Sequence, residues 1–235
     1  MLYKTPEEQI LDIVKSINPK NPQEYVDSIV RPIMVDRINE WILKCHDCKF
    51  HDSIKSCTMG PADASVFVIG EGILQSQYNS DTGSMNEIVY PYIDTPEGNY
   101  LFDILRDRVG ISEKDIFFAN ITNCYCHENI KENIVNRPPS TDEIKCCKVF
   151  MDALIKAINP RVIIALGNVA MNVYQKGVID KLHGQWYNIN GIPAIATYGL
   201  EQLMDIYNAS EDEVCYQYEE NFVSDLKTAI DFAYT

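Results

Sequence analysis

The sequence predicts an α/β fold in which a central sheet of four parallel strands lies between two layers of helices. Four short apolar runs end in glycine or a polar residue, and segments with apolar residues at helical spacing separate them. Strands separated by helices of this length form parallel sheets that are covered on both faces. We therefore expect a three-layer α/β/α domain whose ligands bind at the carboxyl ends of the strands.

The first 44 residues are predicted to form a helical extension that packs on a main domain of residues 45–235. Thr5 and Pro6 have the residue types of a helix N-cap and first turn, and apolar residues recur at helical spacing in 10–17. Two prolines within 18–22 interrupt this pattern, and it returns in 35–42. The extension is therefore expected to contain two helices.

The elements of the main domain alternate along the chain. The predicted strands cover residues 66–69, 116–119, 162–166 and 192–196, and the predicted helices cover 100–109, 141–155, 168–174 and the acidic segment from about 210. Ser140 and Glu143 have the spacing of a capping box, which supports a helix start at that point. The apolar face of that helix is expected to include Ile144, Val149 and Leu154.

Composition and charge restrict the class of protein. The chain has 235 residues, enough to bury a core without disulfides or metals, and its formal net charge is −14. This acidity is mild evidence against nucleic-acid binding, because phosphate contacts need Lys and Arg. The sequence has no long apolar run and no basic-then-apolar start, so we expect a cytoplasmic protein without a membrane span. In such a compartment cysteines are ligands or free thiols.

Four of the eight cysteines have the pattern of a metal centre. Cys45 and Cys48 form a C-x-x-C pair, and Cys124 and Cys147 follow at the edges of predicted elements. A set of four thiolates binds either Zn²⁺ or an iron–sulfur cluster. Both alternatives are open at this point.

The chain resembles the iron–sulfur uracil-DNA glycosylases, often called family 4, over residues 45–203. The resemblance rests on short motifs in the family's order: Cys45 to His51, Val68 to Gly72, Phe118 to Cys124, Asn136 to Cys147, Pro160 to Gly167, His183 to Trp186 and Gly191 to Tyr198. It implies a uracil-DNA glycosylase-like α/β/α fold, a DNA glycosylase activity and DNA as partner. It also implies a monomer and a role in base excision repair.

The resemblance identifies the four cysteines as ligands of a structural [4Fe–4S] cluster. Zn²⁺ is the alternative metal. Cys126 and Cys146 lie one or two residues from these ligands and are expected to take no part in the site. Cys57 and Cys215 are expected to be small buried hydrophobic residues.

The same resemblance assigns the chemistry to strand-end residues. Glu71 would position water or stabilise the developing sugar cation, and Asn120 would pair with the edge of a flipped pyrimidine. Because an amide can be turned over, Asn120 could read either a cytosine-type or a uracil-type edge. Tyr92 would stack on the base, with ordinary core packing as the alternative. The backbone at Gly70 and Gly72 would bind the base or phosphate.

Three features depart from the family's pattern. The loop after Gly72 is different and longer, and the segment between Cys124 and Asn136 carries extra residues, in which His127 is expected to be an exposed loop residue. Gly199 occupies the position where the family has a His that donates a hydrogen bond to uracil O2. Loss of such a donor typically costs about 10²–10³ in rate. His183 is a distant replacement that only the fold could bring near.

These departures rank the possible functions. A Gly in place of His and a longer loop make room for a bulky phage-type base such as hydroxymethylcytosine or its glucosylated form. The leading hypothesis is therefore a glycosylase for a modified pyrimidine, in antiphage defence or in repair. A uracil-DNA glycosylase is the second hypothesis, and a non-catalytic DNA- or protein-binding member of the fold is the third.

Overall fold

A five-stranded sheet forms the centre of the structure. The computed structural model describes residues 23, 26–78, 88–131, 133–209 and 213–235. The strands of the central sheet are β2 (Val66–Gly70), β4 (Ile116–Asn120), β7 (Val162–Leu166), β8 (Trp186–Ile189) and β9 (Ile192–Thr197), in the order β4-β2-β7-β9-β8. The four predicted strands run parallel, whereas β8 pairs antiparallel with β9. The predicted four-stranded sheet is therefore confirmed and extended by one edge strand.

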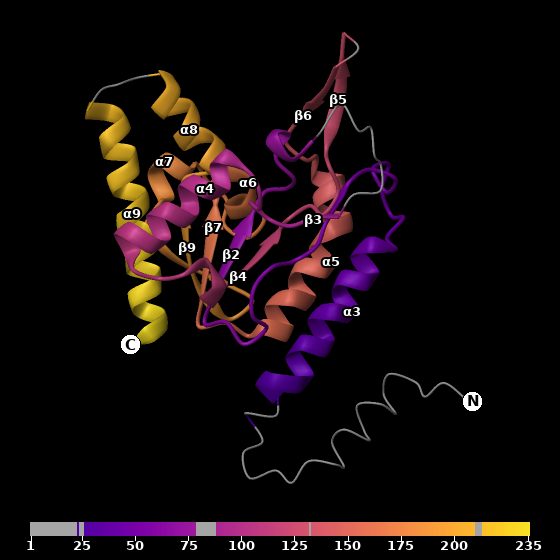
Figure 1. Ribbon diagram of the computed structural model, residues 1–235, viewed down its shortest axis with the longest axis horizontal. Coiled ribbons are helices and arrows are strands. Elements are labelled where there is room, and N and C mark those ends of the chain that lie inside the picture. Colours follow the sequence, from indigo (N-terminus) through magenta and orange to yellow (C-terminus); the bar gives the residue numbers. More distant parts are fainter. Residues whose placement is uncertain (1–22, 24–25, 79–87, 132, 210–212) are drawn as a thin grey trace.

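Helices cover both faces of this sheet, so the three-layer prediction is confirmed (Figure 1). The longer helices are α3 (Arg31–Leu43), α4 (Pro96–Asp103), α5 (Thr141–Ile158), α8 (Leu200–Ala209) and α9 (Glu213–Tyr234). Shorter helices are α6 (Gly167–Asn172) and α7 (Ile179–Leu182), and the π-helical segment Ile104–Val109 continues α4. No helix in the described ranges is long and apolar enough to cross a membrane.

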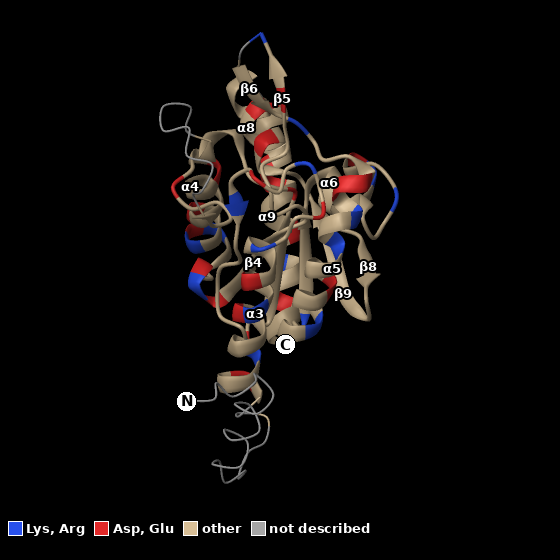
Figure 2. Cartoon of the chain, turned by 90° about the vertical axis from the view of Figure 1, so that its right-hand side faces the viewer, with Lys and Arg blue, Asp and Glu red and all other residues tan. Residues whose placement is uncertain are grey.

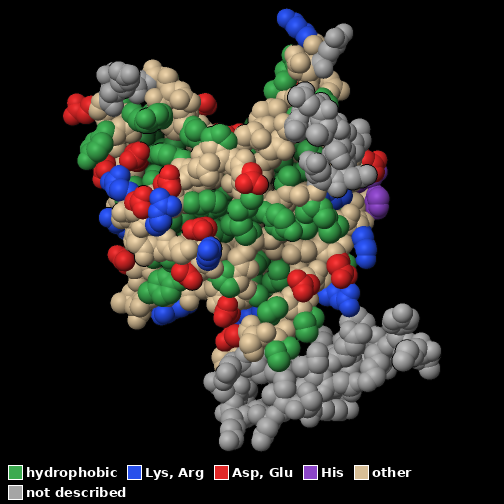
Figure 3. Space-filling model, in the orientation of Figure 1, with side chains coloured by type: hydrophobic (Ala, Val, Ile, Leu, Met, Phe, Trp, Pro, Cys, Tyr) green, Lys and Arg blue, Asp and Glu red, His purple; other side chains and the backbone are tan. Residues whose placement is uncertain are grey.

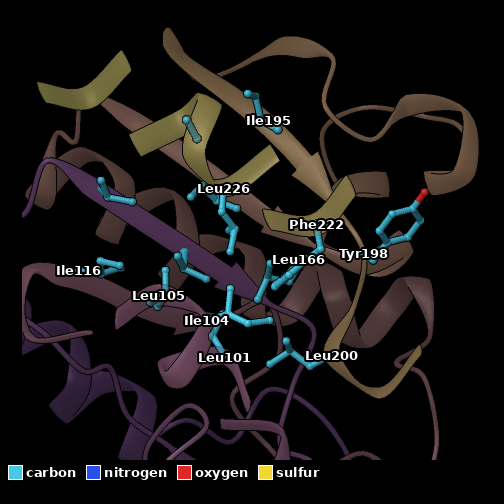
Figure 4. Packing of buried hydrophobic residues seen from close by; sticks show 14 of the residues in the cluster. Leu101, Ile104, Leu105, Ile116, Leu166, Ile195, Tyr198, Leu200, Phe222 and Leu226 are labelled. Atoms are coloured by element: carbon cyan, nitrogen blue, oxygen red, sulfur yellow. The ribbon is translucent and has the colours of Figure 1, made fainter. Parts of the chain in front are cut away.

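Alternation along the strands builds two separate hydrophobic layers. On one face, Val66, Val68 and Phe118 pack with residues of α4, α8 and α9. Figure 4 shows part of this layer, in which Leu101 and Leu105 lie near Ile116 while Phe222 and Leu226 come from α9. On the other face, Phe67 and Phe117 meet edge to face and pack with α3 and α5. This alternation is the normal consequence of strand geometry.

The predicted helical extension is described only in part. The helix expected in 10–17 lies outside the described residues, whereas the second helix is present as α3. Val35, Ile38 and Ile42 of α3 are buried in the layer that contains Phe67. Residues 31–43 therefore contribute to the core of the main domain, and the boundary at residue 45 stays a prediction.

Helix α5 begins as predicted, and Ile144 and Leu154 of its predicted apolar face pack in the core, whereas Val149 does not. Ser140 accepts from the backbone N–H of Glu143, and Glu143 accepts from the backbone N–H of Ser140, so the capping box is confirmed. Val149, expected on the apolar face, is 60% exposed, because Cys147, Phe150 and Met151 take the buried positions.

Two small sheets lie beside the central one. A parallel pair joins β1 (Lys55–Ser56) to β3 (Ile88–Val89). An antiparallel hairpin of β5 (His127–Ile130) and β6 (Asn133–Asn136) projects from the body (Figure 1). The expectation of an exposed loop at His127 is wrong, because this residue opens a strand and its half-buried ring stacks on Tyr125.

Candidate active site and metal centre

The carboxyl ends of the parallel strands meet at one edge of the sheet. The strand register places Gly70 beside Asn120 and Leu166 beside Thr197. The segments that follow these strands enclose a cavity of about 270 Å³, whose wall includes Glu71, Tyr92, Gly167, Gly199, Leu200 and Glu201. The cavity therefore lies where ligands bind in open α/β sheets.

This edge of the molecule is hollowed between two projections. Figure 3 shows a notch between α8 and the β5–β6 hairpin. A second, very narrow cavity lies between the hairpin and α8, since its lining includes Asn136 at the end of the hairpin and Glu201 at the start of α8. Glu71 lines this cavity as well as the first. Acidic and basic residues are scattered along the chain (Figure 2), and Lys131 follows β5 in the hairpin.

Backbone and side-chain hydrogen bonds hold Glu71 beside the end of β4. The Gly70 carbonyl accepts from the Ile121 N–H at 2.8 Å, and the Glu71 carbonyl accepts from both the N–H and the hydroxyl of Thr122 at 3.0 and 3.1 Å. These bonds continue the pairing of β2 and β4 beyond the strands. The Glu71 carboxylate is half-buried on the wall of the cavity.

Glycine is required at positions 70 and 72 because neighbouring side chains lie too close to the backbone for a Cβ atom. A Cβ at Gly70 would lie 2.1 Å from the Tyr92 hydroxyl and 2.6 Å from Oδ1 of Asn120, and one at Gly72 would lie 2.7 Å from the Thr122 hydroxyl. The glycines therefore allow neighbouring side chains to reach the floor of the site. The backbone binding roles predicted for them stay predictions.

Asn120 is buried with one side of its amide paired and the other unpaired. It is 2% exposed, and its Nδ2 donates to the Ser56 hydroxyl at 3.3 Å. Its Oδ1 is buried and has no hydrogen-bond partner in the part of the chain that the structure describes. Such an oxygen is costly unless a ligand supplies a donor.

Tyr92 is a buried core residue that also borders the cavity, and its stacking on a base stays a prediction. Its side chain is 4% exposed and belongs to the same core layer as Phe118, yet it also forms part of the cavity wall. Its backbone has a φ of 66°, and the Tyr92 carbonyl accepts from the Thr95 hydroxyl at 2.8 Å. Burial raises the pKa of Tyr92, so its hydroxyl is protonated and able to donate.

Glu201 is a second carboxylate in the site and was missed by sequence reasoning. It is an exposed residue in the first turn of α8, where it lines both cavities with Glu71. Burial raises the pKa of Glu71 to about 7, and the charge of Glu201 adds to this effect. The sequence offers no specific signal, since acidic residues are common in first helical turns for their effect on the helix dipole.

The space at Gly199 is partly filled by neighbouring backbone. A Cβ at Gly199 would lie 3.4 Å from the Cα of Gly167, because α6 and α8 begin side by side. His183 does not replace the missing His, because its Nδ1 lies 3.1 Å from the Asp225 carboxylate and its ring packs on Tyr198, away from the cavity wall. The lack of a side chain at Gly199 therefore adds less room to the cavity than the sequence suggests.

The four predicted metal ligands come together between α3, the end of β4 and α5. The Lys55 ammonium lies 3.0 Å from the Cys45 carbonyl and 3.8 Å from the Cys124 sulfur. Burial raises the pKa of Cys124 to about 12; Lys55 opposes this, whereas Cys147, Cys48 and Cys45 add to it. The four thiols are thus close enough to interact.

Cys126 and Cys146, which lie close to the proposed ligands in the sequence, donate hydrogen bonds to backbone carbonyls. The Cys126 thiol donates to the Cys124 carbonyl at 3.6 Å, and the Cys146 thiol donates to the Asp47 carbonyl at 3.4 Å. Cys57 is buried as expected, whereas Cys215 is partly exposed. The separation of ligands from the other cysteines stays a prediction, because Cys126 and Cys146 also lie near the four proposed ligands.

A group of potential ligand atoms as compact as a zinc site lies outside the four cysteines. Tetrahedral Zn²⁺ with bonds of about 2.3 Å holds its sulfurs about 3.8 Å apart. Among the described residues, the close group of three potential ligand atoms within 4.8 Å is His46, His51 and Asp52, and no three cysteine sulfurs lie that close.

Comparison with known proteins gives a consistent match. The sequence model of the Uracil DNA glycosylase superfamily matches residues 58–219. The type-4 uracil-DNA glycosylase of Thermotoga maritima is 28% identical over 149 residues, 63% of this chain and 69% of that protein. The type-4 enzyme of Saccharolobus solfataricus is 24% identical over 162 residues, 66% of this chain and 68% of that protein. The matched range contains the strand-end cavity and two of the four clustered cysteines.

Proposed function

Since the chain belongs to the uracil DNA glycosylase superfamily and is a DNA glycosylase, we propose that it hydrolyses the N-glycosidic bond of a flipped-out uracil and leaves an abasic site. The observation that supports this proposal is that Glu71, on the cavity wall, directly follows Gly70, the strand partner of Asn120. The unpaired Oδ1 of Asn120 lacks a donor, and the N3–H of uracil would supply one.

The proposed mechanism divides three tasks among this chain's residues. Asn120 binds the edge of the base after it leaves the stack, and Tyr92 forms a wall of the base pocket. The Glu71 carboxylate orients the attacking water and stabilises the positive charge that develops on the sugar as the bond to the base breaks. The water adds to the sugar carbon, its proton passes to Glu71, and the base leaves with the bonding electrons.

Uracil is proposed ahead of a bulkier base for two reasons. The relatives named above are uracil-DNA glycosylases. The backbone of Gly167 limits the room that Gly199 would create. A modified pyrimidine stays a second candidate because the cavity has a volume of about 270 Å³ and is lined by both Glu71 and Gln202.

One experiment decides between these bases. The protein is incubated with DNA that carries uracil, hydroxymethyluracil, hydroxymethylcytosine or glucosylated hydroxymethylcytosine, and abasic sites are then cleaved with alkali. We expect strand breaks at uracil. Breaks confined to a bulky base would favour the second candidate and with it the role in defence, and no breaks on any DNA would overturn the enzymatic proposal.

We also propose that Cys45, Cys48, Cys124 and Cys147 hold a [4Fe–4S] cluster. The cluster would supply a structural clamp that joins the end of α3 to the segment after β4 and to α5. The Lys55 ammonium beside the Cys124 sulfur and the backbone N–H of Asn123 beside Cys147 support this role, because both stabilise thiolates.

The pH dependence of excision tests the coupling of Glu71 to Glu201. If ionised Glu71 is the active form, the rate rises with pH through a midpoint of about 7. Glu201→Gln removes a negative charge that raises the pKa of Glu71, so the midpoint should move to lower pH. Single-turnover rates measured across pH check this. Asp205→Asn is the control, because Asp205 acts on Glu201 and not on Glu71; an unchanged midpoint in Glu201→Gln would contradict the coupling.

A further inference from the structure

We propose that Ser56 is a positioning residue that locks the Asn120 amide in one orientation, so that the site reads one pyrimidine edge and rejects the other. This inference rests on the proposed function and deepens it, because it concerns how the base is selected. Ser56 lies 64 residues before Asn120 and outside the motifs that identify the family.

The direction of the amide follows from the Ser56 hydroxyl. This hydroxyl lies 3.2 Å from the Cys57 carbonyl, and a carbonyl can only accept, so the single hydroxyl hydrogen is used there. Ser56 can then only accept from Asn120. The group of Asn120 that faces Ser56 at 3.3 Å must therefore be Nδ2, and Oδ1 must point the other way.

The Ser56 hydroxyl is itself held in place. Ser56 is 1% exposed, and its N–H donates to the Asn123 carbonyl at 2.8 Å. Strand β1 pairs with β3, and Lys55 is tied to the Cys45 carbonyl. The hydroxyl therefore has a fixed position from which to orient the amide.

The free side of the amide faces the end of β2, from which the chain continues as Glu71 into the cavity wall. Oδ1 lies next to Gly70, where the Tyr92 hydroxyl also approaches. One Nδ2 hydrogen is used by Ser56, so Asn120 offers an acceptor and one remaining donor. Uracil presents a donor at N3–H for Oδ1 and an acceptor at O4 for Nδ2. Cytosine presents the opposite arrangement, with an acceptor at N3 and a donor at the N4 amine. A locked amide separates these edges, and an amide that can turn over does not.

The experiment compares binding of two uncleavable ligands. DNA that carries 2′-fluoroarabino-uridine or 2′-fluoroarabino-cytidine at one position resists hydrolysis, because fluorine disfavours the sugar cation. The wild-type protein is expected to bind the uridine DNA more tightly. Ser56→Ala should reduce the ratio of the two affinities by about tenfold, since the freed amide can pair with either edge. Ser56→Thr keeps the hydroxyl and should keep the ratio.

Thr58→Ala is the matched control. The Thr58 hydroxyl is buried in the same segment and accepts from Nδ2 of Asn39 at 3.0 Å, away from the base site. This variant should therefore keep the wild-type ratio. A ratio that is unchanged in Ser56→Ala, or equally reduced in Thr58→Ala, would overturn the inference.

Excision assays on DNA that carries unmodified uracil separate the two proposals. If the wild type does not excise uracil but Ser56→Ala loses the preference for uridine DNA, the proposed activity is refuted and the role of Ser56 is kept. If the wild type excises uracil but the affinity ratio is unchanged in Ser56→Ala, the activity is kept and the role of Ser56 is refuted.

Discussion

Glu71→Gln is expected to reduce uracil excision by about 10²–10⁴-fold while DNA binding and the fold are kept. The amide has nearly the shape of the carboxylate, but it can neither accept the proton of the attacking water nor stabilise the sugar cation with a negative charge. Glu71 is half-buried on the cavity wall, where its carboxylate can contact a bound sugar and water. Single-turnover excision and binding of the uncleavable uridine DNA measure the two effects separately.

Glu113→Gln is the control for the change in charge. Glu113 precedes β4 and so lies at the opposite end of that strand from Asn120. Its replacement changes the net charge equally and should leave the rate unchanged. A Glu71→Gln protein that excises uracil at the wild-type rate would remove Glu71 from the mechanism.

Cys147→Ser is expected to abolish the metal centre, and Cys146→Ser is expected to leave it intact. The Cys147 sulfur is buried near the other three proposed ligands, whereas the neighbouring Cys146 thiol donates to the Asp47 carbonyl. Wild-type protein should be brown, with about four irons per chain. Cys147→Ser should lose colour and iron and unfold at a lower temperature, because the clamp between α3 and α5 is lost.

Metal analysis and visible absorbance check this pair of variants. Equal iron loss in both would show that the ligand has been assigned to the wrong neighbour. A colourless wild-type protein with about one zinc per chain would contradict the cluster and support the alternative metal.

Local sequence patterns predicted the parallel strands and the capping box well, because both depend on neighbouring residues. Edge strand β8 was missed although Asn190 and Gly191 form a typical hairpin turn with positive φ angles before β9. The β5–β6 hairpin was missed because neither of its strands alternates polar and apolar residues and β5 has no buried residue.

The sequence by itself determined the fold class and the strand-end position of Glu71 and Asn120, whereas its choice of four cysteines among eight stays a prediction. Only the tertiary structure decided that Glu201 faces Glu71, that Gly167 fills part of the space at Gly199, and that Ser56 orients Asn120. The physical reason is that these contacts join residues far apart in the chain. Strand register and helix starts decide which of them meet, and no local pattern encodes that choice.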